Sequence, residues 1–139
     1  MSDPIYRLDP RLAADTHPVA RWELSDVLLM NDARFPWLIL VPRVVDATEL
    51  FHLSSDQQSR VTTEMSGAGR AMQSLWSADK VNTAMLGNKV SQLHIHVIAR
   101  FREDDAWPGP VWGVGQPRSY TEAALEHCLN KLQSGLPSL

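Results

Sequence analysis

The sequence predicts an α+β domain built on an antiparallel sheet. Segments typical of strands and helices follow one another in the order strand, strand, helix, strand, strand, helix. The longer helical segment carries apolar residues at helical spacing, and the last strand segment alternates polar with apolar residues. The apolar side of that strand can therefore lie against the apolar stripe of the helix.

Size and composition indicate a single domain with one core. The chain has 139 residues, of which 44% are hydrophobic, enough to build one buried core. We therefore interpret residues 1–139 as one domain. Within it we expect an N-terminal arm at 1–20, a core at 22–112 and a C-terminal helix at 119–135.

Net charge, cysteine content and the lack of long apolar stretches limit the partners and the compartment that we expect for this protein. A formal net charge of -3 argues against a nucleic-acid partner but allows a small anion in a local pocket. Cys128 is the only cysteine, so the chain cannot form a disulfide framework, which suits a reducing compartment. No stretch approaches the roughly 18 apolar residues of a membrane span, and no signal peptide is evident. We therefore expect a cytoplasmic protein with no membrane partner.

The first half of the core predicts a hairpin followed by a helix. Trp22–Met30 and Trp37–Pro42 are rich in β-formers, and turn-forming residues lie between them. The pairs Asp46 with Glu49 and Ser54 with Gln57 both fit the capping box. After the second pair, an apolar stripe predicts a helix over Gln57–Ser77.

The second half predicts two strands, a long loop and a final helix. Lys80–Leu86 is typical of a strand, and Val90–Phe101 is expected to be the longest strand of the protein. A loop rich in Pro, Gly and Trp follows at Asp104–Pro117. Ser119 and Glu122 form a further capping pair, which places the start of the last helix here.

The strand Val90–Phe101 carries the residues with chemical potential. Because side chains alternate across a strand, Gln92, His94 and His96 share one face, together with Ile98 and Arg100. Three interpretations compete for the two histidines: exposed residues of a half-buried strand, ligands of a metal ion, or a nucleophile acting at phosphorus with a hydrogen-bonding neighbour. A metal would need further ligands, and no motif directs His17, His52 or His127 to this strand.

The segment Gly87–Arg100 resembles the signature of the histidine triad (HIT) superfamily, in which His-x-His-x-His is followed by two apolar residues. The hairpin Leu28–Arg43 resembles the nucleoside-binding hairpin of that family, and the capped helix between the two falls where the family has one. The similarity runs from near Trp22 to near Trp112. The Gln-x-His-x-His motif and the following Trp-Pro-Gly-Pro-Val-Trp-Gly segment are similar to a branch of small bacterial members.

The resemblance implies a fold, an assembly and an activity. The expected fold is a five-stranded antiparallel sheet with two main helices, extended to ten strands in a homodimer. The implied function is cleavage at the α-phosphate of a nucleotide, either a dinucleoside polyphosphate, as by diadenosine tetraphosphate hydrolases, or a nucleoside phosphoramidate. His94 would be the nucleophile that forms a covalent nucleotidyl intermediate, and His96 would hydrogen-bond the phosphate. Asn31 matches a residue that contacts the ribose, although an asparagine here is also typical of a plain turn.

Several positions depart from the family pattern. Gln92 stands where the first histidine of the triad belongs, a position that by the resemblance supports the catalytic imidazole. An amide there can still donate and accept hydrogen bonds, but the exchange favours, as the alternative, a nucleotide-binding protein with little turnover. Asn88 stands in place of a phosphate-contacting glutamine, and Lys89 either pairs with a polyphosphate or is solvated.

The loop after the reactive strand holds two tryptophans. Trp107 and Trp112 are candidates for a lid or a base-stacking wall, or else for packing at the sheet edge or a second subunit. An imidazole nucleophile is already available near neutral pH, so no metal or other cofactor is expected.

Overall fold

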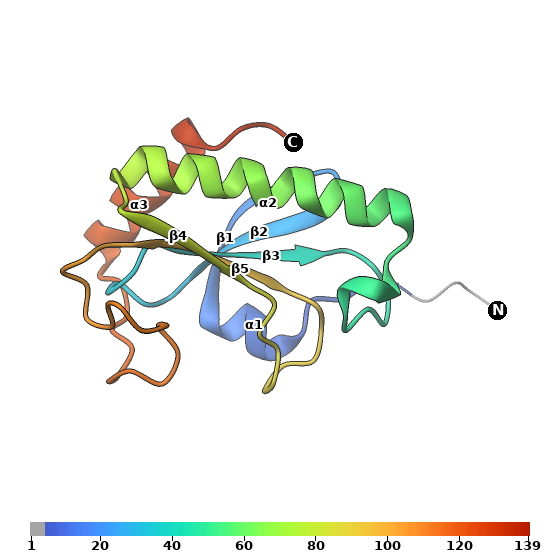
Figure 1. Cartoon of the computed structure of the whole chain (residues 1–139), viewed down its shortest axis with the longest axis horizontal. Coiled ribbons are helices and arrows are strands. Elements are labelled where there is room, and N and C mark those ends of the chain that lie inside the picture. Colours follow the sequence, from blue (N-terminus) through green and yellow to red (C-terminus); the bar gives the residue numbers. More distant parts are fainter. Residues whose placement is uncertain (1–4) are drawn as a thin grey trace.

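The computed structural model describes residues 5–139 and has one antiparallel sheet with helices on both faces (Figure 1). The five strands lie in the order β1-β2-β3-β5-β4. The strands are β1 (Thr16–Arg21), β2 (Ser25–Met30), β3 (Trp37–Pro42), β4 (Lys80–Ala84) and β5 (Ile95–Arg100). The helices are α1 (Pro10–Asp15), α2 (Ser55–Trp76), α3 (Glu122–Gly135) and the short 3-10 turn η1 (Leu50–His52). The predicted α+β class and five-stranded antiparallel sheet are confirmed.

The predicted N-terminal arm is in large part folded, and this corrects the expectation for residues 1–20. Residues 1–4 lie outside the part that the structure describes. Asp9 caps α1 by accepting a hydrogen bond from the amide of Arg11 at 2.8 Å, and β1 then pairs with β2 as an edge strand. The pattern was missed because β1 alternates poorly: its register shifts between Pro18 and Ala20, and a bulged edge strand leaves little hydrophobic period.

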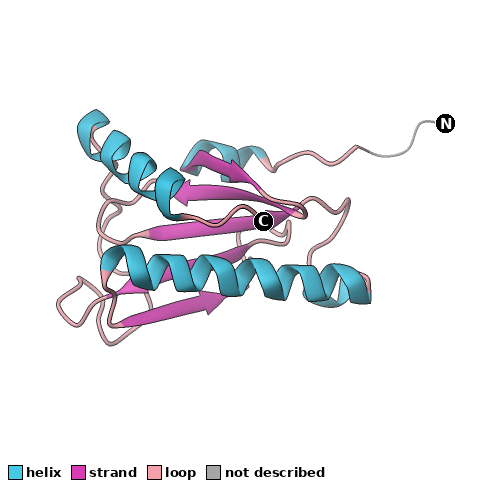
Figure 2. Cartoon of the chain, turned by 90° about the horizontal axis from the view of Figure 1, so that it is seen from above, coloured by secondary structure: helices cyan, strands magenta, loops and turns pink. Residues whose placement is uncertain are grey.

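The two main helices cover one face of the sheet (Figure 2). Helix α2 lies over β3, β4 and β5, while α3 lies against β1 and the side of α2. The predicted Ser54 and Gln57 capping box is present, with the Ser54 amide donating to Gln57 Oε1 at 2.8 Å. The hydrophobic core of this layer includes Val27, Leu29, Leu38, Leu40, Val61, Ala68, Met72, Leu93, Ile95, Val97, Ala99 and Leu132.

Two other predicted capping pairs are wrong. Asp46 has a φ of 60°, and Glu49 instead forms a capping box with His52 at η1. Helix α3 is capped by Thr121, whose hydroxyl accepts from the amide of Ala124 at 3.1 Å. In both places several hydroxyl and carboxylate residues lie close together in the sequence, so the pattern alone did not identify the one that caps.

Strand β5, which carries His96, is shorter than the predicted strand Val90–Phe101. Strand β5 begins at Ile95, so residues 90–94 form a loop, because the amide of Leu93 donates to Ala47 in the β3–η1 connection and not to a neighbouring strand. The alternation nevertheless holds. Leu93, Ile95, Val97 and Ala99 all face α2, as the pattern predicts.

The opposite face of the sheet carries a second, smaller core. Leu12 of α1 packs there with Phe35, Trp37 and Ile98, and Val111 of the loop after β5 completes the group. The N-terminal segment and this loop thus enclose the face on which His96 lies. In the described part of the chain, no helix is long and apolar enough to cross a membrane.

The loop after β5 is held by a buried ion pair. Arg100 is 1% exposed and donates to both carboxylate oxygens of Asp104, at 2.8 and 3.0 Å. Asp104 also accepts from the amides of Phe101 and Trp107. Burial raises the pKa of Asp104, but the bonds from Arg100 and these amides outweigh it and lower the pKa to about 2. Arg100 on this strand therefore pairs with Asp104, and its guanidinium is not free to bind a phosphate.

We expect Asp104→Asn to destabilise the protein by about 3–5 kcal/mol, because it leaves the buried Arg100 guanidinium without a counter-ion. Urea unfolding of the variant measures this loss. Asp105→Asn, which changes an exposed neighbouring carboxylate, is the matched control. Equal stabilities of the two variants would contradict the assigned role of the ion pair.

Candidate active site

His94 lies just before β5, and its ring is fixed by a backbone carbonyl. His94 Nδ1 lies 2.7 Å from the main-chain oxygen of Gln92. A carbonyl can only accept, so Nδ1 carries the proton and the lone pair of the neutral ring is on Nε2. Among residues 5–139, no hydrogen-bond partner occupies Nε2. His94 is therefore held with one nitrogen anchored and the other available as a nucleophile.

Gly87 allows a tight turn next to the His94 ring. A Cβ on Gly87 would lie 2.8 Å from the carbonyl oxygen of Val90, which is too close, whereas its 3.5 Å distance to His94 Cε1 would be an ordinary contact. A side chain at this position would therefore clash with the backbone of the turn 87–90. The glycine before the motif thus permits the close backbone approach within this turn.

His96 is also a fixed, neutral ring, but both of its nitrogens are occupied. Trp37 Nε1 donates to His96 Nδ1 at 3.0 Å, and His96 Nε2 donates to the carbonyl of Leu86 at 3.0 Å. Burial lowers the pKa of His96 to about 4; the Leu86 carbonyl opposes this shift, and the charge of His94 adds to it. His96 is therefore a neutral hydrogen-bond donor near physiological pH.

Aromatic rings connect the histidines to a cavity. The centroid of His96 lies 4.9 Å from that of His94 and 5.0 Å from that of Trp112. Trp112 in turn contacts Trp37 edge to face, and both line a cavity of about 530 Å³. The cavity lies between the β2–β3 turn and the loops on either side of β5. Its lining includes Met30, Asn31, Trp37, Lys89, Val111 and Trp112.

The predicted binding residues are only partly brought together. Asn31 and Lys89 both line the cavity, whereas Asn88 lies exposed on the loop. The Asn31 side chain accepts from the amide of Tyr120 at 3.0 Å and donates to the hydroxyl of Ser119 at 3.3 Å. Part of the hydrogen-bonding capacity of Asn31 is thus used to attach the segment before α3 to the cavity wall.

The two loop tryptophans have different positions. Trp112 forms the cavity wall beside His96. Trp107 lies against Arg100, whose guanidinium carbon is 5.7 Å from the centroid of the Trp107 ring. Trp107 does not line the cavity. The geometry places Trp112 at the candidate site and makes Trp107 part of the support of the loop.

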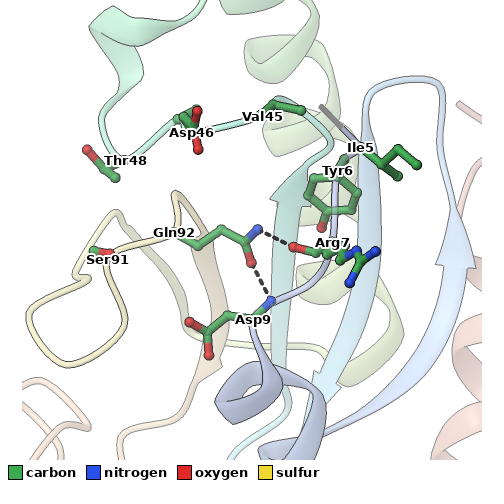
Figure 3. A pocket seen from close by; sticks show the side chains of 10 residues that line it. Ile5, Tyr6, Arg7, Asp9, Val45, Asp46, Thr48, Ser91 and Gln92 are labelled. Atoms are coloured by element: carbon green, nitrogen blue, oxygen red, sulfur yellow. Dashed lines mark hydrogen bonds between the residues drawn. The ribbon is translucent and has the colours of Figure 1, made fainter. Parts of the chain in front are cut away.

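The Gln92 side chain points toward the N-terminal segment (Figure 3). Gln92 Nε2 donates to the carbonyl of Arg7, and Gln92 Oε1 accepts from the amide of Asp9, both at 2.8 Å. A second cavity, of about 380 Å³, borders this contact and is lined by Tyr6, Asp46 and Ser91, among others. Gln92 hydrogen-bonds the candidate nucleophile through its main-chain oxygen, while its side chain bonds Arg7 and Asp9.

The other histidines lie elsewhere in the fold. His17 is on β1, His52 is in η1 and His127 is on α3. Within residues 5–139, no group of three or more His, Cys, Asp or Glu side chains is arranged to hold a metal ion.

Three contributors to the site were missed in the sequence. Trp37 was identified only as a strand residue, Gly87 only as part of a tight connection, and residues 7–9 only as an arm. The register between β3 and β5, which pairs Trp37 with Ile98, places the indole beside His96. No local pattern encodes that register, although a glycine directly before a reactive motif is a usable signal of close approach.

The comparisons with known proteins agree with this architecture. A model of the HIT domain family matches residues 11–103, well over half of the chain. A search among curated proteins found no match. Solved histidine triad proteins from three bacteria are similar over nearly their whole length.

The similarity to these three structures is high. The protein from Marinobacter aquaeolei is 48% identical, with a TM-score of 0.93 over 96% of this chain and 97% of that one. The protein from Bradyrhizobium japonicum is 42% identical, with a TM-score of 0.94 over 96% and 100%. The protein from Sinorhizobium meliloti is 40% identical, with a TM-score of 0.92 over 94% and 97%. The family match, the fold and the arrangement of His94 and His96 together establish that this chain belongs to the histidine triad (HIT) family.

Proposed function

We propose that the protein is a nucleotide hydrolase or transferase that acts at the α-phosphate through a covalent bond to His94. The observation that carries the proposal is the His94 ring, whose Nδ1 is anchored on the Gln92 carbonyl while Nε2 has no partner among the described residues. The substrate class is a dinucleoside polyphosphate or a nucleoside phosphoramidate. Both offer an α-phosphorus with a leaving group, which is what an imidazole nucleophile requires.

The proposed reaction has two displacements. The Nε2 lone pair of His94 attacks the α-phosphorus, a P–N bond forms, and the bond from phosphorus to the leaving group breaks. The resulting imidazolium keeps its Nδ1 proton on the Gln92 carbonyl, which stabilises the positive charge. Water then attacks the same phosphorus, the P–N bond breaks, and the products are a nucleoside monophosphate, a proton and the original ring.

The cavity beside Trp112 is the proposed nucleoside site. Its volume of about 530 Å³ falls in the range of pockets that take small ligands, and two indole rings form part of its wall. Lys89 at its rim supplies positive charge for phosphate oxygens. A phosphate oxygen bound next to His94 would replace the Leu86 carbonyl as the acceptor of the His96 Nε2 proton.

The first prediction for the proposed function concerns His94. We expect His94→Ala to lower kcat by several orders of magnitude and to retain nucleotide binding, because the nucleophile is lost and the cavity is unchanged. The measurement is hydrolysis of dinucleoside polyphosphates and adenosine phosphoramidate with chelator present, together with trapping of labelled nucleotide on the protein. His127→Ala, an exposed histidine on α3, is the control.

The same experiment separates the enzyme from a binding protein. Turnover that survives His94→Ala would reject the covalent mechanism. If the unmodified protein binds nucleotide tightly but forms no adduct and turns over no substrate of the panel, the proposal fails in favour of a nucleotide-binding protein.

A second prediction concerns the protonation of His96. Because its pKa is about 4 in the fold and near 6.5 in the unfolded chain, the unfolded state binds the proton first. The stability from the neutral ring is fully present above pH 6.5 and is lost as the pH falls toward 4. Between pH 7 and 5 we expect a loss of about 2 kcal/mol from this residue.

Urea unfolding at several pH values measures that loss, with His96→Asn as the comparison. The variant should lose less stability than the unmodified protein over the same interval. Nitrogen-15 spectra of the imidazoles should show His96 neutral at pH 6. A charged His96 at that pH would contradict the assignment and make the ring a candidate general acid.

The proposal includes a homodimer formed through β4. This strand lies at an edge of the sheet, and Met85 and Leu86 directly after it are 37% and 38% exposed. Pairing with a second copy would cover both and extend the sheet. Sedimentation equilibrium should give twice the chain mass, and Met85→Glu should shift the protein toward the monomer. A monomeric unmodified protein at high concentration would reject the dimer.

A further inference from the structure

Residues 7–11 of the N-terminal segment bind the loop that carries the active-site carbonyl. Gln92 makes two hydrogen bonds to the main chain of Arg7 and Asp9, both of 2.8 Å (Figure 3). Next to them, Arg11 Nη1 donates to the carbonyl of Lys89 at 2.8 Å. Three hydrogen bonds thus join two segments that lie about eighty residues apart in the chain.

The two bonds of Gln92 suit an amide. The carbonyl of Arg7 and the amide of Asp9 lie two residues apart and face the same side chain. A carboxamide presents an acceptor and a donor from one planar group, so it meets both at once. A neutral imidazole also has one donor and one acceptor, but its two nitrogens lie on different sides of a rigid ring and point in more divergent directions. We therefore expect a histidine at position 92 to meet these two main-chain groups less well.

The peptide unit between Gln92 and Leu93 is what this contact immobilises. Its oxygen accepts from His94 Nδ1 at 2.7 Å, and its N–H donates to the carbonyl of Ala47 at 2.9 Å. The loop outside β5 has no ladder to hold this unit in place. Ala47 restrains it from one direction and the N-terminal segment, through Gln92, from another.

The N-terminal segment is itself anchored, so it can serve as a support. Leu12 is 4% exposed and packs in the smaller core under β3, and Tyr6 and Leu8 pack against the same group. Helix α1 and β1 then continue directly into the sheet. Movement of residues 7–9 away from Gln92 would therefore disturb packed side chains.

We infer that Gln92 is a positioning residue, which fixes the His94 ring by tying the carbonyl that anchors it to the N-terminal segment. In this role the amide is a functional replacement for the first triad histidine and not a defect. The inference rests on the proposed function for its effect on rate. Its structural part, the orientation of His94, does not depend on the substrate.

The test compares three variants of the full chain. Gln92→Leu removes both bonds, and Gln92→His installs the residue of the family motif. Gln58→Leu is the matched control, because Gln58 also donates from Nε2 to a main-chain carbonyl, that of Leu53 at 3.0 Å, but on α2. Thermal unfolding of all three first establishes that they are folded.

Two readouts are independent of any substrate. In nitrogen-15 spectra, His94 should be a single Nδ1–H tautomer in the unmodified protein and in Gln58→Leu, and should become a mixture in Gln92→Leu and Gln92→His. Trypsin should cut after Arg7 and Arg11 faster in the two Gln92 variants than in the control. Unchanged spectra and cleavage in both Gln92 variants would overturn the inference.

The third readout is the rate of labelling of His94 in a single turnover. We expect the two Gln92 variants to lower this labelling rate, and kcat with it in the steady state, by about 10- to 100-fold with KM unchanged, because the ring loses its orientation while the cavity is intact. A Gln92→His variant as fast as the unmodified protein would also overturn the inference. If no variant and no unmodified protein turns over substrate, yet the tautomer shifts, the proposed function fails and the positioning role stands.

Discussion

The hydrogen bond from His94 Nδ1 to the carbonyl of Gln92 is the interaction on which the organisation of the site depends. It decides which nitrogen carries the proton, and so which one is free to react. The Gln92 carbonyl can hold the ring in this orientation only if the loop that carries it does not move. Gly87 permits the tight turn at residues 87–90, Ala47 holds the Leu93 amide, and the N-terminal segment holds the Gln92 side chain. Distant parts of the chain therefore converge on one peptide unit.

Much of the fold could be predicted because it follows from short-range periodicity. The stripe of α2 and its Ser54 cap, the β2–β3 hairpin, and the alternation from Leu93 to Ala99 were all readable from neighbouring residues. The edge strand β1 was not, since a bulged strand with one exposed side has almost no period. The true start of β5 was also missed, because it is set by a bond from Leu93 to Ala47, 46 positions away in the sequence.

The candidate site, like the fold, could be predicted only in part. The motif indicates which histidines matter, and the structure brings His94 and His96 together as expected. The resemblance implies that position 92 supports the catalytic imidazole, but the partners of the Gln92 side chain could not be predicted, because they are main-chain groups 83 and 85 positions away. Nor could the position of Trp112: the loop that carries it is shaped by the buried ion pair of Arg100 and Asp104. Residue identity thus predicts the chemistry, whereas tertiary contacts determine the support around it.

The two histidines show how a fold can separate the duties of identical side chains. They lie two positions apart and are similarly buried, at 5% and 3% exposure, so burial alone does not distinguish them. Their partners do. His94 has one anchored nitrogen and one available nitrogen, whereas His96 is held by an indole donor on one side and a carbonyl acceptor on the other. A ring with both nitrogens engaged can contribute a directed N–H but cannot attack phosphorus without breaking a bond. The hydrogen-bond partners of the two rings thus support the proposed role of His94 as the nucleophile, independently of the order of residues in the motif.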